Sequence, residues 1–312
     1  MGDEGLASNL RVRLQPPDQA GPTSPGSRRV IPVEAGQVVG MAESPIEAWR
    51  RKPDSSIAVG IRMVQEGRAD AFVSAGNTGA IAAGSLFTLG PMRGVERPAI
   101  ATLYRTAGGG ISIILDIGAN VDCRPRFLLE FGQMGSAFMA KVFQVDKPRV
   151  GLLSNGEEES KGTRLVREAH KLLKESDLNF IGNVEGFDLL SGASDVIVTD
   201  GFTGNVVLKL AEALTGTIFM SLKDALGSSP LARASKALWG PPIMSVARKW
   251  DYSSVGGAPL LGVNGNIVMA HGRSEAADVK RAVELARRMI REGWHRPAVQ
   301  GEFPRPSIVS NQ

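Results

Sequence analysis

The chain has 312 residues, of which 43% are hydrophobic, and its formal net charge at pH 7 is +4. This length allows one large domain or two smaller ones, and the charge is too small to predict nucleic-acid binding, although it suits anionic substrates, an acidic protein partner or an anionic membrane surface. The single cysteine, Cys123, excludes an internal disulfide framework and a multi-cysteine metal site.

The N-terminal segment 1–29 is rich in Pro, Gly and Ser, and its few apolar residues show no period. This composition predicts a disordered tail, followed by a single α/β domain over residues 30–312. We find neither a secretory signal pattern nor an apolar run of the roughly 20 residues that span a bilayer, so we expect a cytoplasmic protein.

Two short helices are predicted before the first strand. Ser44 followed by Pro45 is typical of a capped helix start with proline in the first turn. Asp54 or Ser55 can cap the next helix, which Gly67 would end.

A short apolar strand followed by a loop rich in Gly, Asn, Ser and Asp recurs six times along the chain. In a parallel sheet these loops would all lie along one edge, where ligands of open α/β sheets bind. Six such loops therefore predict a site for a polar, anionic ligand. The strands are expected at 71–74, 111–115, 150–153, 180–181, 196–198 and 267–270.

The remaining elements complete an α/β pattern. A further strand is expected at 99–103, and a buried helix rich in small residues at 79–89. A helix with a broad apolar face is expected at 126–145, and Ser274 can cap the last main helix. The Gly-rich segment 256–262 is interpreted as a loop lining a site.

The stretch 195–209 organises the predicted site. A β-branched strand ends in a tight loop, after which helical spacing begins at Val206. Gly201 and Gly204 allow close approach of a ligand, and a helix start offers free N–H groups to an anion. An ordinary strand–helix turn with capping residues is the alternative. The polar side chains here are those of Asp200, Thr203, Asn205 and Lys209.

Six motifs in a fixed order carry a family resemblance. They are SAGNTGA (74–80), LDIGAN (115–120), SNGEEESKG (154–162), GNVEG (182–186), TDGFTGNVVLK (199–209) and GGAPLLGVNG (256–265). Together they resemble the bacterial phosphate acyltransferase family of phospholipid synthesis, from about residue 30 to about residue 293. The resemblance implies transfer of a fatty acyl group from acyl carrier protein to inorganic phosphate, which gives acyl phosphate. It also implies a Rossmann-like α/β/α sandwich with a mostly parallel sheet, and no cofactor or metal.

A site of amides, hydroxyls, glycines and a few lysines suits a reaction in which phosphate is itself the nucleophile. The protein then has to hold phosphate beside the thioester and stabilise the oxyanion. His271 could protonate the leaving thiolate or be structural, and Lys161 could instead form a surface ion pair. The candidate catalytic residues are Lys161, Asp200, Asn205, Lys209 and His271. The candidate binding residues are Asn77, Thr78, Asp116, Asn120, Ser160, Asn183, Thr203, Gly204 and Asn264.

A helical hairpin is predicted over about 217–252, projecting from the sheet domain. Its apolar tip carries Trp239, Ile243 and Met244, and basic residues follow. Tryptophan beside basic residues is typical of a bilayer interface, although Trp239 could equally pack against a partner subunit. The resemblance implies a homodimer that contacts the cytoplasmic face of the membrane peripherally.

Other function classes receive less support. The sequence holds no G-x-S-x-G, no G-x-x-x-x-G-K-[ST] and no G-x-G-x-x-G after a strand, which disfavours serine hydrolases, nucleoside triphosphatases and dinucleotide oxidoreductases. Cys123 as an acyl-carrying nucleophile is a minor alternative to a buried structural thiol. Two rival functions remain: a short-chain phosphotransacetylase, and an inactive homologue that serves as a membrane-bound scaffold. The second rests on the absence of the family's N-terminal loop, which reads roughly D-A-M-G-G-D.

Overall fold

The computed structural model describes residues 31–227 and 256–295, and within them eight strands form one sheet. The strands are β1 (Ala71–Ser74), β2 (Ala99–Arg105), β3 (Ile111–Leu115), β4 (Val150–Leu153), β5 (Phe180–Val184), β6 (Val196–Val198), β7 (Ala258–Leu261) and β8 (Asn266–Met269). Their order across the sheet is β1-β8-β7-β2-β3-β6-β4-β5. All seven strands expected from the sequence are therefore present.

The sheet is mixed, with four parallel and three antiparallel pairings. β2 runs antiparallel to both β3 and β7, and β7 runs antiparallel to β8. Consequently β1 and β8 point opposite to β3, β6, β4 and β5. The expectation that all six loops share one edge was wrong, because the loops after β1 and β8 leave from the other edge.

The strand β7 was not predicted, because its residues argue against a strand. Pro259 lacks a backbone donor, and two glycines precede the strand. Its pairing with β8 overrides these preferences. A Cβ on Gly257 would lie 2.5 Å from the carbonyl oxygen of Met269, so glycine is needed where the two strands meet.

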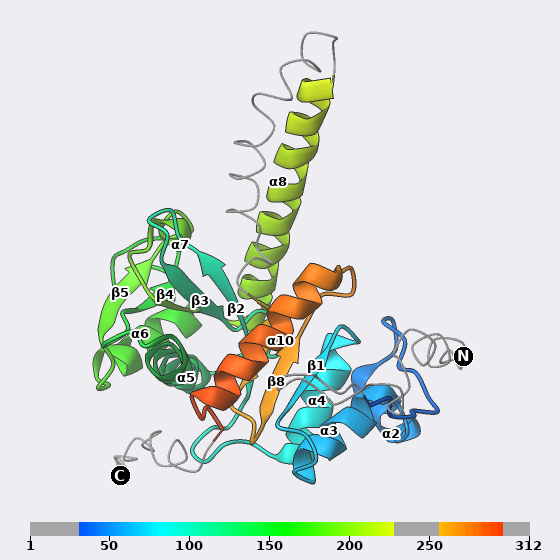
Figure 1. Cartoon of the computed structure of the whole chain (residues 1–312). Coiled ribbons are helices and arrows are strands. Elements are labelled where there is room, and N and C mark those ends of the chain that lie inside the picture. Colours follow the sequence, from blue (N-terminus) through cyan, green and yellow to red (C-terminus); the bar gives the residue numbers. More distant parts are fainter. Residues whose placement is uncertain (1–30, 228–255, 296–312) are drawn as a thin grey trace, which may run out of the picture.

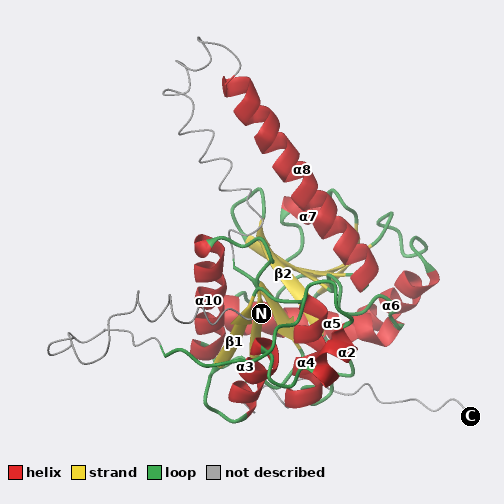
Figure 2. Ribbon diagram, turned by 90° about the vertical axis from the view of Figure 1, so that its right-hand side faces the viewer, coloured by secondary structure: helices red, strands yellow, loops and turns green. Residues whose placement is uncertain are grey.

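Helices cover both faces of the sheet and confirm the three-layer α/β/α sandwich (Figures 1 and 2). Contacts with the strands place α5 and α10 on one face and α3 and α4 on the other. The helices are α2 (Pro45–Arg51), α3 (Ser56–Gln65), α4 (Thr78–Leu89), α5 (Pro125–Phe143), α6 (Arg164–Lys174), α7 (Asp188–Ser191), α8 (Gly201–Gly227) and α10 (Ala276–Arg291).

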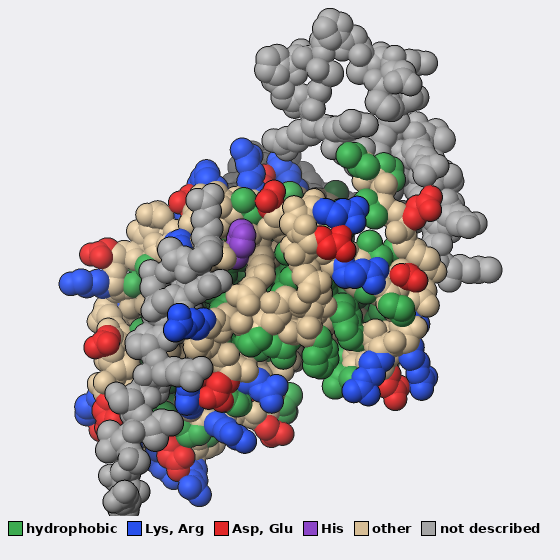
Figure 3. Space-filling view, turned by 90° about the horizontal axis from the view of Figure 1, so that it is seen from below, with side chains coloured by type: hydrophobic (Ala, Val, Ile, Leu, Met, Phe, Trp, Pro, Cys, Tyr) green, Lys and Arg blue, Asp and Glu red, His purple; other side chains and the backbone are tan. Residues whose placement is uncertain are grey.

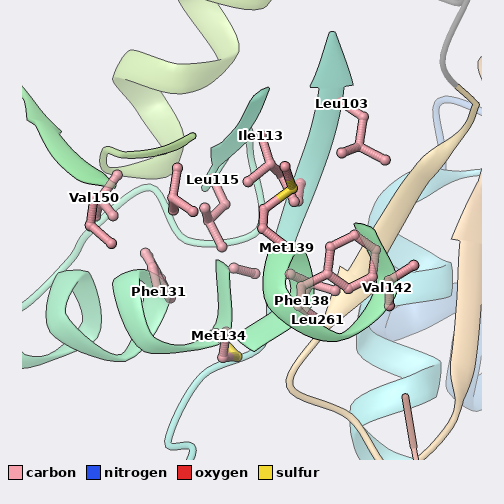
Figure 4. Close-up of a cluster of buried hydrophobic side chains, with 14 of the residues drawn as sticks. Leu103, Ile113, Leu115, Phe131, Met134, Phe138, Met139, Val142, Val150 and Leu261 are labelled. Carbon is pink, nitrogen blue, oxygen red and sulfur yellow. The ribbon is translucent and has the colours of Figure 1, made fainter. Parts of the chain in front are cut away.

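Two apolar clusters fill the spaces between the layers. Side chains of β2 alternate between them, since Ala101 and Leu103 belong to one cluster and Ile100 and Tyr104 to the other. Burial on both faces is what a sheet between two helical layers requires. Figure 4 shows the first cluster, in which α5 side chains such as Phe138 lie against the strands.

Small residues let α4 pack tightly against its neighbours, as predicted, although the partner is α2. A Cβ on Gly84 would lie 2.3 Å from the Trp49 ring, and one on Gly79 would lie 2.5 Å from Pro45. α2 begins with Pro45 in its first turn, as expected.

The capping predictions were confirmed for one helix and wrong for another. Ser55 caps α3, with its side chain accepting a hydrogen bond from Ala58. The cap of α10 is Glu275 and not Ser274. Glu275 and Asp278 form a reciprocal capping box, which fixes the helix start one residue later.

The helix α8 projects away from the body of the molecule (Figure 1). Its 27 residues correspond to a length of about 40 Å. Only the first limb of the predicted hairpin lies within the described residues, and Trp239, Ile243 and Met244 lie outside them, as does the predicted 1–29 tail. Among residues 31–227 and 256–295, no helix combines the length and apolar character needed to cross a bilayer.

Candidate active site

A pocket of about 650 Å³ lies where the two halves of the sheet meet. Its walls come from the start of α4, the loop after β3, one face of α8 and the loop after β8. Loops that leave opposite edges of the sheet are thus brought to one cavity. The predicted site residues that line it are Thr78, Asn205, Lys209 and His271.

The loop after β3 is shaped by Asp116, which is fully buried. Its Oδ1 accepts from the backbone N–H of Ile100, Gly118 and Ala119 at 3.0, 3.2 and 3.1 Å. Its Oδ2 accepts from the backbone N–H of Asn120 at 2.6 Å. Burial raises the pKa of the Asp116 carboxyl, and these hydrogen bonds oppose the rise. Asp116 therefore orients the loop and has no direct access to phosphate.

The side chain of Asn120 serves the same loop. Its Nδ2 donates to the Pro98 carbonyl at 2.8 Å and to Asp116 Oδ2 at 3.0 Å. Both donors of this amide are engaged with protein acceptors. We find Asn120 in a structural position and outside the pocket lining.

Asn205 and Gly118 meet at the pocket wall. Asn205 Nδ2 donates to the Ile117 carbonyl at 3.0 Å, which leaves its second N–H for a ligand. Gly118 has a φ of 139°, which favours glycine. A Cβ there would also lie 2.9 Å from Asn205 Nδ2. Glycine at 118 thus lets the loop backbone approach α8.

Two cations line the pocket. Lys209 Nζ lies 3.1 Å from Glu212 Oε2, and both side chains are exposed, so this pair is weak and exchangeable. Arg273 makes no ion pair with any described residue. It follows His271 on the loop after β8, and its position beside that histidine was the sequence signal that could have identified it.

His271 has a defined tautomer. The backbone N–H of Arg273 donates to His271 Nδ1 at 3.2 Å. The neutral ring therefore carries its proton on Nε2. An exposed Nε2–H in the pocket is placed to donate to a ligand.

Asn77 does not face the pocket with its amide. Its Oδ1 caps α4 by accepting from Ala80 at 3.0 Å. Its Nδ2 donates to the carbonyls of Gly40, Met41 and Glu43 at 3.1, 3.2 and 3.1 Å. Asn77 is 6% exposed and ties the segment 40–43 to the start of α4.

Polar groups at the start of α8 form hydrogen bonds with one another. Asp200 accepts from the Thr203 N–H at 2.9 Å and from the Thr203 hydroxyl at 2.7 Å. A Cβ on Gly204 would lie 1.9 Å from the Asp116 carbonyl oxygen, so glycine there permits helix–loop packing. These three residues lie beside the pocket and not in its lining.

The loop after β4 lies elsewhere. Ser160 lines a second pocket of about 550 Å³, beside α6. Asn183 Oδ1 lies 2.9 Å from His170 Nδ1, and its Nδ2 donates to the Glu158 carbonyl at 2.9 Å. Lys161 lies on the same loop and forms no ion pair with the described residues, despite the neighbouring glutamates.

Asn264 lies at the β7–β8 turn, away from both pockets. Its Nδ2 donates to the carbonyls of Leu89 and Pro91 at 3.2 and 2.9 Å. It therefore joins this turn to the end of α4. The described residues contain no group of three His, Cys, Asp or Glu side chains that could hold a metal ion.

Cys123 is unsuited to nucleophilic attack. Burial and the nearby carboxylates of Asp116 and Asp200 raise the pKa of its thiol to about 11. The thiol is therefore protonated near neutral pH. Its Sγ donates to the Asn120 carbonyl at 3.4 Å, which fits a structural role.

The sequence was compared with protein families and curated relatives. A family model described as "Fatty acid synthesis protein" matches residues 22–296. The phosphate acyltransferase of Heliobacterium modesticaldum is 46% identical over 282 residues, which cover 90% of this chain and 84% of that protein. The chain belongs to the phosphate acyltransferase family. The phosphate acyltransferase of Myxococcus xanthus is 45% identical over 308 residues, covering 98% of this chain and 83% of that protein.

Solved structures support the fold of this phosphate acyltransferase family member. A phosphotransacetylase from Streptococcus pyogenes matches with a TM-score of 0.53 and 20% identity, over 78% of this chain and 70% of that one. A branched-chain phosphotransacylase from Enterococcus faecalis matches with a TM-score of 0.52 and 13% identity, over 76% of this chain and 79% of that one. At these identities the likeness shows the α/β architecture alone.

Proposed function

We propose that this chain transfers a fatty acyl group from an acyl carrier protein thioester to inorganic phosphate. The observation that carries the proposal is the pocket between α4 and α8, which combines cations and hydrogen-bond donors with apolar walls. The names of the relatives support the reaction class. An enzyme that joins phosphate to an acyl group needs charged groups for the phosphate and apolar walls for the acyl group in one cavity.

The chemistry follows from the residues in the pocket. Lys209 and Arg273 attract phosphate, and the start of α4 at Thr78 adds N–H groups that favour an anion. A phosphate oxygen attacks the thioester carbonyl carbon, and the carbonyl oxygen becomes an oxyanion held by the same donors. The C–S bond then breaks. The leaving thiolate accepts a hydrogen bond from His271 Nε2 and takes its proton from the hydroxyl of the transferred phosphate, which stays bonded to the acyl carbon, so the products are a thiol and an acyl phosphate.

A short-chain phosphotransacetylase is the second candidate. The chain shares its α/β fold with solved phosphotransacetylases, so the fold is compatible with both candidates. The two candidates differ in the donor, a long-chain acyl carrier protein or acetyl-coenzyme A. Comparing turnover with each donor at equal concentration separates them.

A homodimer is part of the proposal. Apolar side chains recur at four-residue intervals along the exposed face of α8, which is unusual for a helix that faces water. We further propose a cytoplasmic protein that contacts the membrane peripherally through Trp239, Ile243 and Met244. The exposed stripe consists of Phe202, Val206, Leu210, Leu214 and Ile218.

The donor requires a docking surface for an acidic carrier protein. Figure 3 shows one face of the molecule, on which Lys and Arg side chains are interspersed with Asp and Glu. That face lacks an extended basic patch. The cations at the pocket mouth, Lys209 and Arg273, are therefore the better-supported contact for the acidic donor.

The test is acyl phosphate formation from palmitoyl-acyl carrier protein and inorganic phosphate. Turnover that depends on phosphate supports the proposal. Turnover with acetyl-coenzyme A alone favours the short-chain alternative. A folded protein that turns over neither donor, yet binds anionic lipid vesicles, supports the inactive scaffold.

A further inference from the structure

The segment 40–43 carries no family motif, yet the structure places it at the mouth of the candidate active site. Met41 lines the pocket, and its side chain is 63% exposed. We infer that Met41, held in place by Asn77, contacts the acyl chain of the bound substrate and strengthens binding of long-chain substrates. This inference rests on the proposed acyl transfer to phosphate.

The segment is fixed by an unusual number of hydrogen bonds. Three of its carbonyls accept from the single amide of Asn77. The backbone N–H of Gly40 donates to Glu43 Oε1 at 2.7 Å, and Lys52 Nζ lies 2.6 Å from the same oxygen. A backbone fixed in this way places the exposed Met41 side chain at the pocket before a ligand binds.

The Met41 side chain extends across the pocket mouth. A Cβ on Gly272 would lie 3.4 Å from Met41 Cε, so the methyl group reaches the loop after β8. The side chain therefore bridges the start of α4 and the loop that bears His271.

The pocket walls near the bridge are apolar. Ile100, Ile117 and Leu208 line the cavity together with Met269, whereas Lys209 and Arg273 supply the charges. Phosphate suits the charged groups, so the apolar walls are left for the carbons next to the thioester. Methionine is flexible and polarisable, which suits contact with a mobile alkyl chain.

Asn77 acts in this scheme as a positioning residue. Asn77→Ser keeps an oxygen that can cap α4 but removes the amide that holds the segment. If Asn77 works through Met41, the two substitutions affect the same contact and are not additive. Asn77→Ser in a Met41→Ala background should then add less than twofold.

The experiment measures binding of dodecyl phosphate, a stable analogue of an acyl phosphate, to the full chain by calorimetry. We expect Met41→Ala to weaken dodecyl phosphate binding about tenfold and inorganic phosphate binding less than twofold. Val38→Ala is the matched control. Val38 is 49% exposed in the same part of the chain but does not line the pocket.

The outcomes separate this inference from the proposed function. Equal losses for both ligands, or no loss for either, overturn the role of Met41. Independent effects of Asn77→Ser and Met41→Ala overturn the positioning role of Asn77. If wild-type protein binds dodecyl phosphate in a Met41-dependent manner but forms no acyl phosphate, the Met41 contact stands and the proposed transfer reaction is refuted.

Discussion

The pocket between α4 and α8 and the pocket beside α6 make an instructive comparison. Each lies beside loops rich in Gly, Asn and Ser that follow strands, and the sequence treats them alike. Around the pocket between α4 and α8, the side chains of His271 (at Nε2) and Arg273 have no partner among residues 31–227 and 256–295. Around the pocket beside α6, most of the charged groups have protein partners. The composition of a loop is thus a weaker indicator of a ligand site than whether its polar groups already have hydrogen-bond or ion-pair partners in the protein.

The pairing beside α6 is extensive. Glu159 pairs with Lys174 and lies 3.6 Å from His170 Nε2, while Arg164 lies 2.6 Å from Glu168. The His170 ring also stacks edge-on against Phe180, with centroids 5.0 Å apart. Lys161, on the loop after β4, differs from these residues, because it forms no ion pair with the described residues.

The largest effect is expected beside the pocket between α4 and α8, where the start of α8 packs most tightly against the loop after β3. Gly204→Ala should destabilise the protein by at least about 3 kcal/mol, because its Cβ would lie 1.9 Å from the Asp116 carbonyl oxygen. Gly186→Ala, near the other pocket, is the control, since no atom lies within 4 Å of its added Cβ. Urea unfolding measures both. Equal stability of the two variants would contradict the packing argument.

The next effect tests the hydrogen bond to the leaving group. His271→Ala should lower kcat roughly 100-fold, because the developing thiolate then loses its hydrogen-bond donor. His170→Asn is the contrasting variant, and its effect should be on stability, since His170 is buried beside Asn183. The measurement is acyl phosphate formation at saturating substrates, with folding checked by circular dichroism. A His271 variant with normal kcat would remove this residue from the mechanism.

Substitutions of Lys209 and of Lys161 compare the two pockets directly. Lys209→Met should raise the KM for phosphate about tenfold through loss of a charge-assisted contact. We expect a loss of similar size for Lys161→Met, because its side chain is left available for substrate. In the proposed homodimer, each pocket between α4 and α8 would take Lys209 from one subunit and Lys161 from its partner. A mixed dimer of the two variants then keeps one pocket with both lysines, so mixing the variants should restore part of the activity. Full activity of Lys161→Met would confine the site to the pocket between α4 and α8.

The sequence predicted more of the fold than of the site. Strands such as β3 and β6 were predicted with their bounds, because buried β-branched runs between Gly-rich loops have few other structures. The directions of the strands were not predictable, since they depend on antiparallel pairings of β2 that no local pattern encodes.

Sequence gives the least information about a site where a polar residue has two possible uses. Asn77 and Asp116 follow strands as ligand-binding residues do, but their partners are backbone groups of segments 40–43 and 117–120. Only the tertiary structure shows which N–H and C=O groups need these partners. Conversely, Met41 lies in a segment without a motif, and Arg273 is one of many surface arginines in sequence.

A smaller effect concerns Cys123, which lies behind the first pocket. Cys123→Ser should leave kcat within about twofold, because a thiol whose pKa is raised to about 11 is not a nucleophile at neutral pH. Iodoacetamide should label the native protein at pH 8 roughly 100-fold more slowly than the unfolded chain. Complete inactivation of the serine variant, with the fold retained, would restore the acyl-cysteine alternative.

The smallest effect lies beside α6 and depends on pH. The hydrogen bond from Lys174, with its charge, lowers the pKa of the Glu159 carboxyl below its ordinary value of 4.5. A carboxyl with a lowered folded-state pKa stabilises the fold above its unfolded pKa, and this contribution is lost as the pH falls through the folded value.

We therefore expect wild type to melt at a higher temperature than Glu159→Gln at pH 6, and the gap to close as the pH falls below 4.5. Melting curves from pH 3 to pH 6 measure this. Glu157→Gln is the control, since Glu157 lies on the same loop without an ion pair to any described residue. A gap that persists at pH 3 would mean that Glu159 acts through packing and not through its charge.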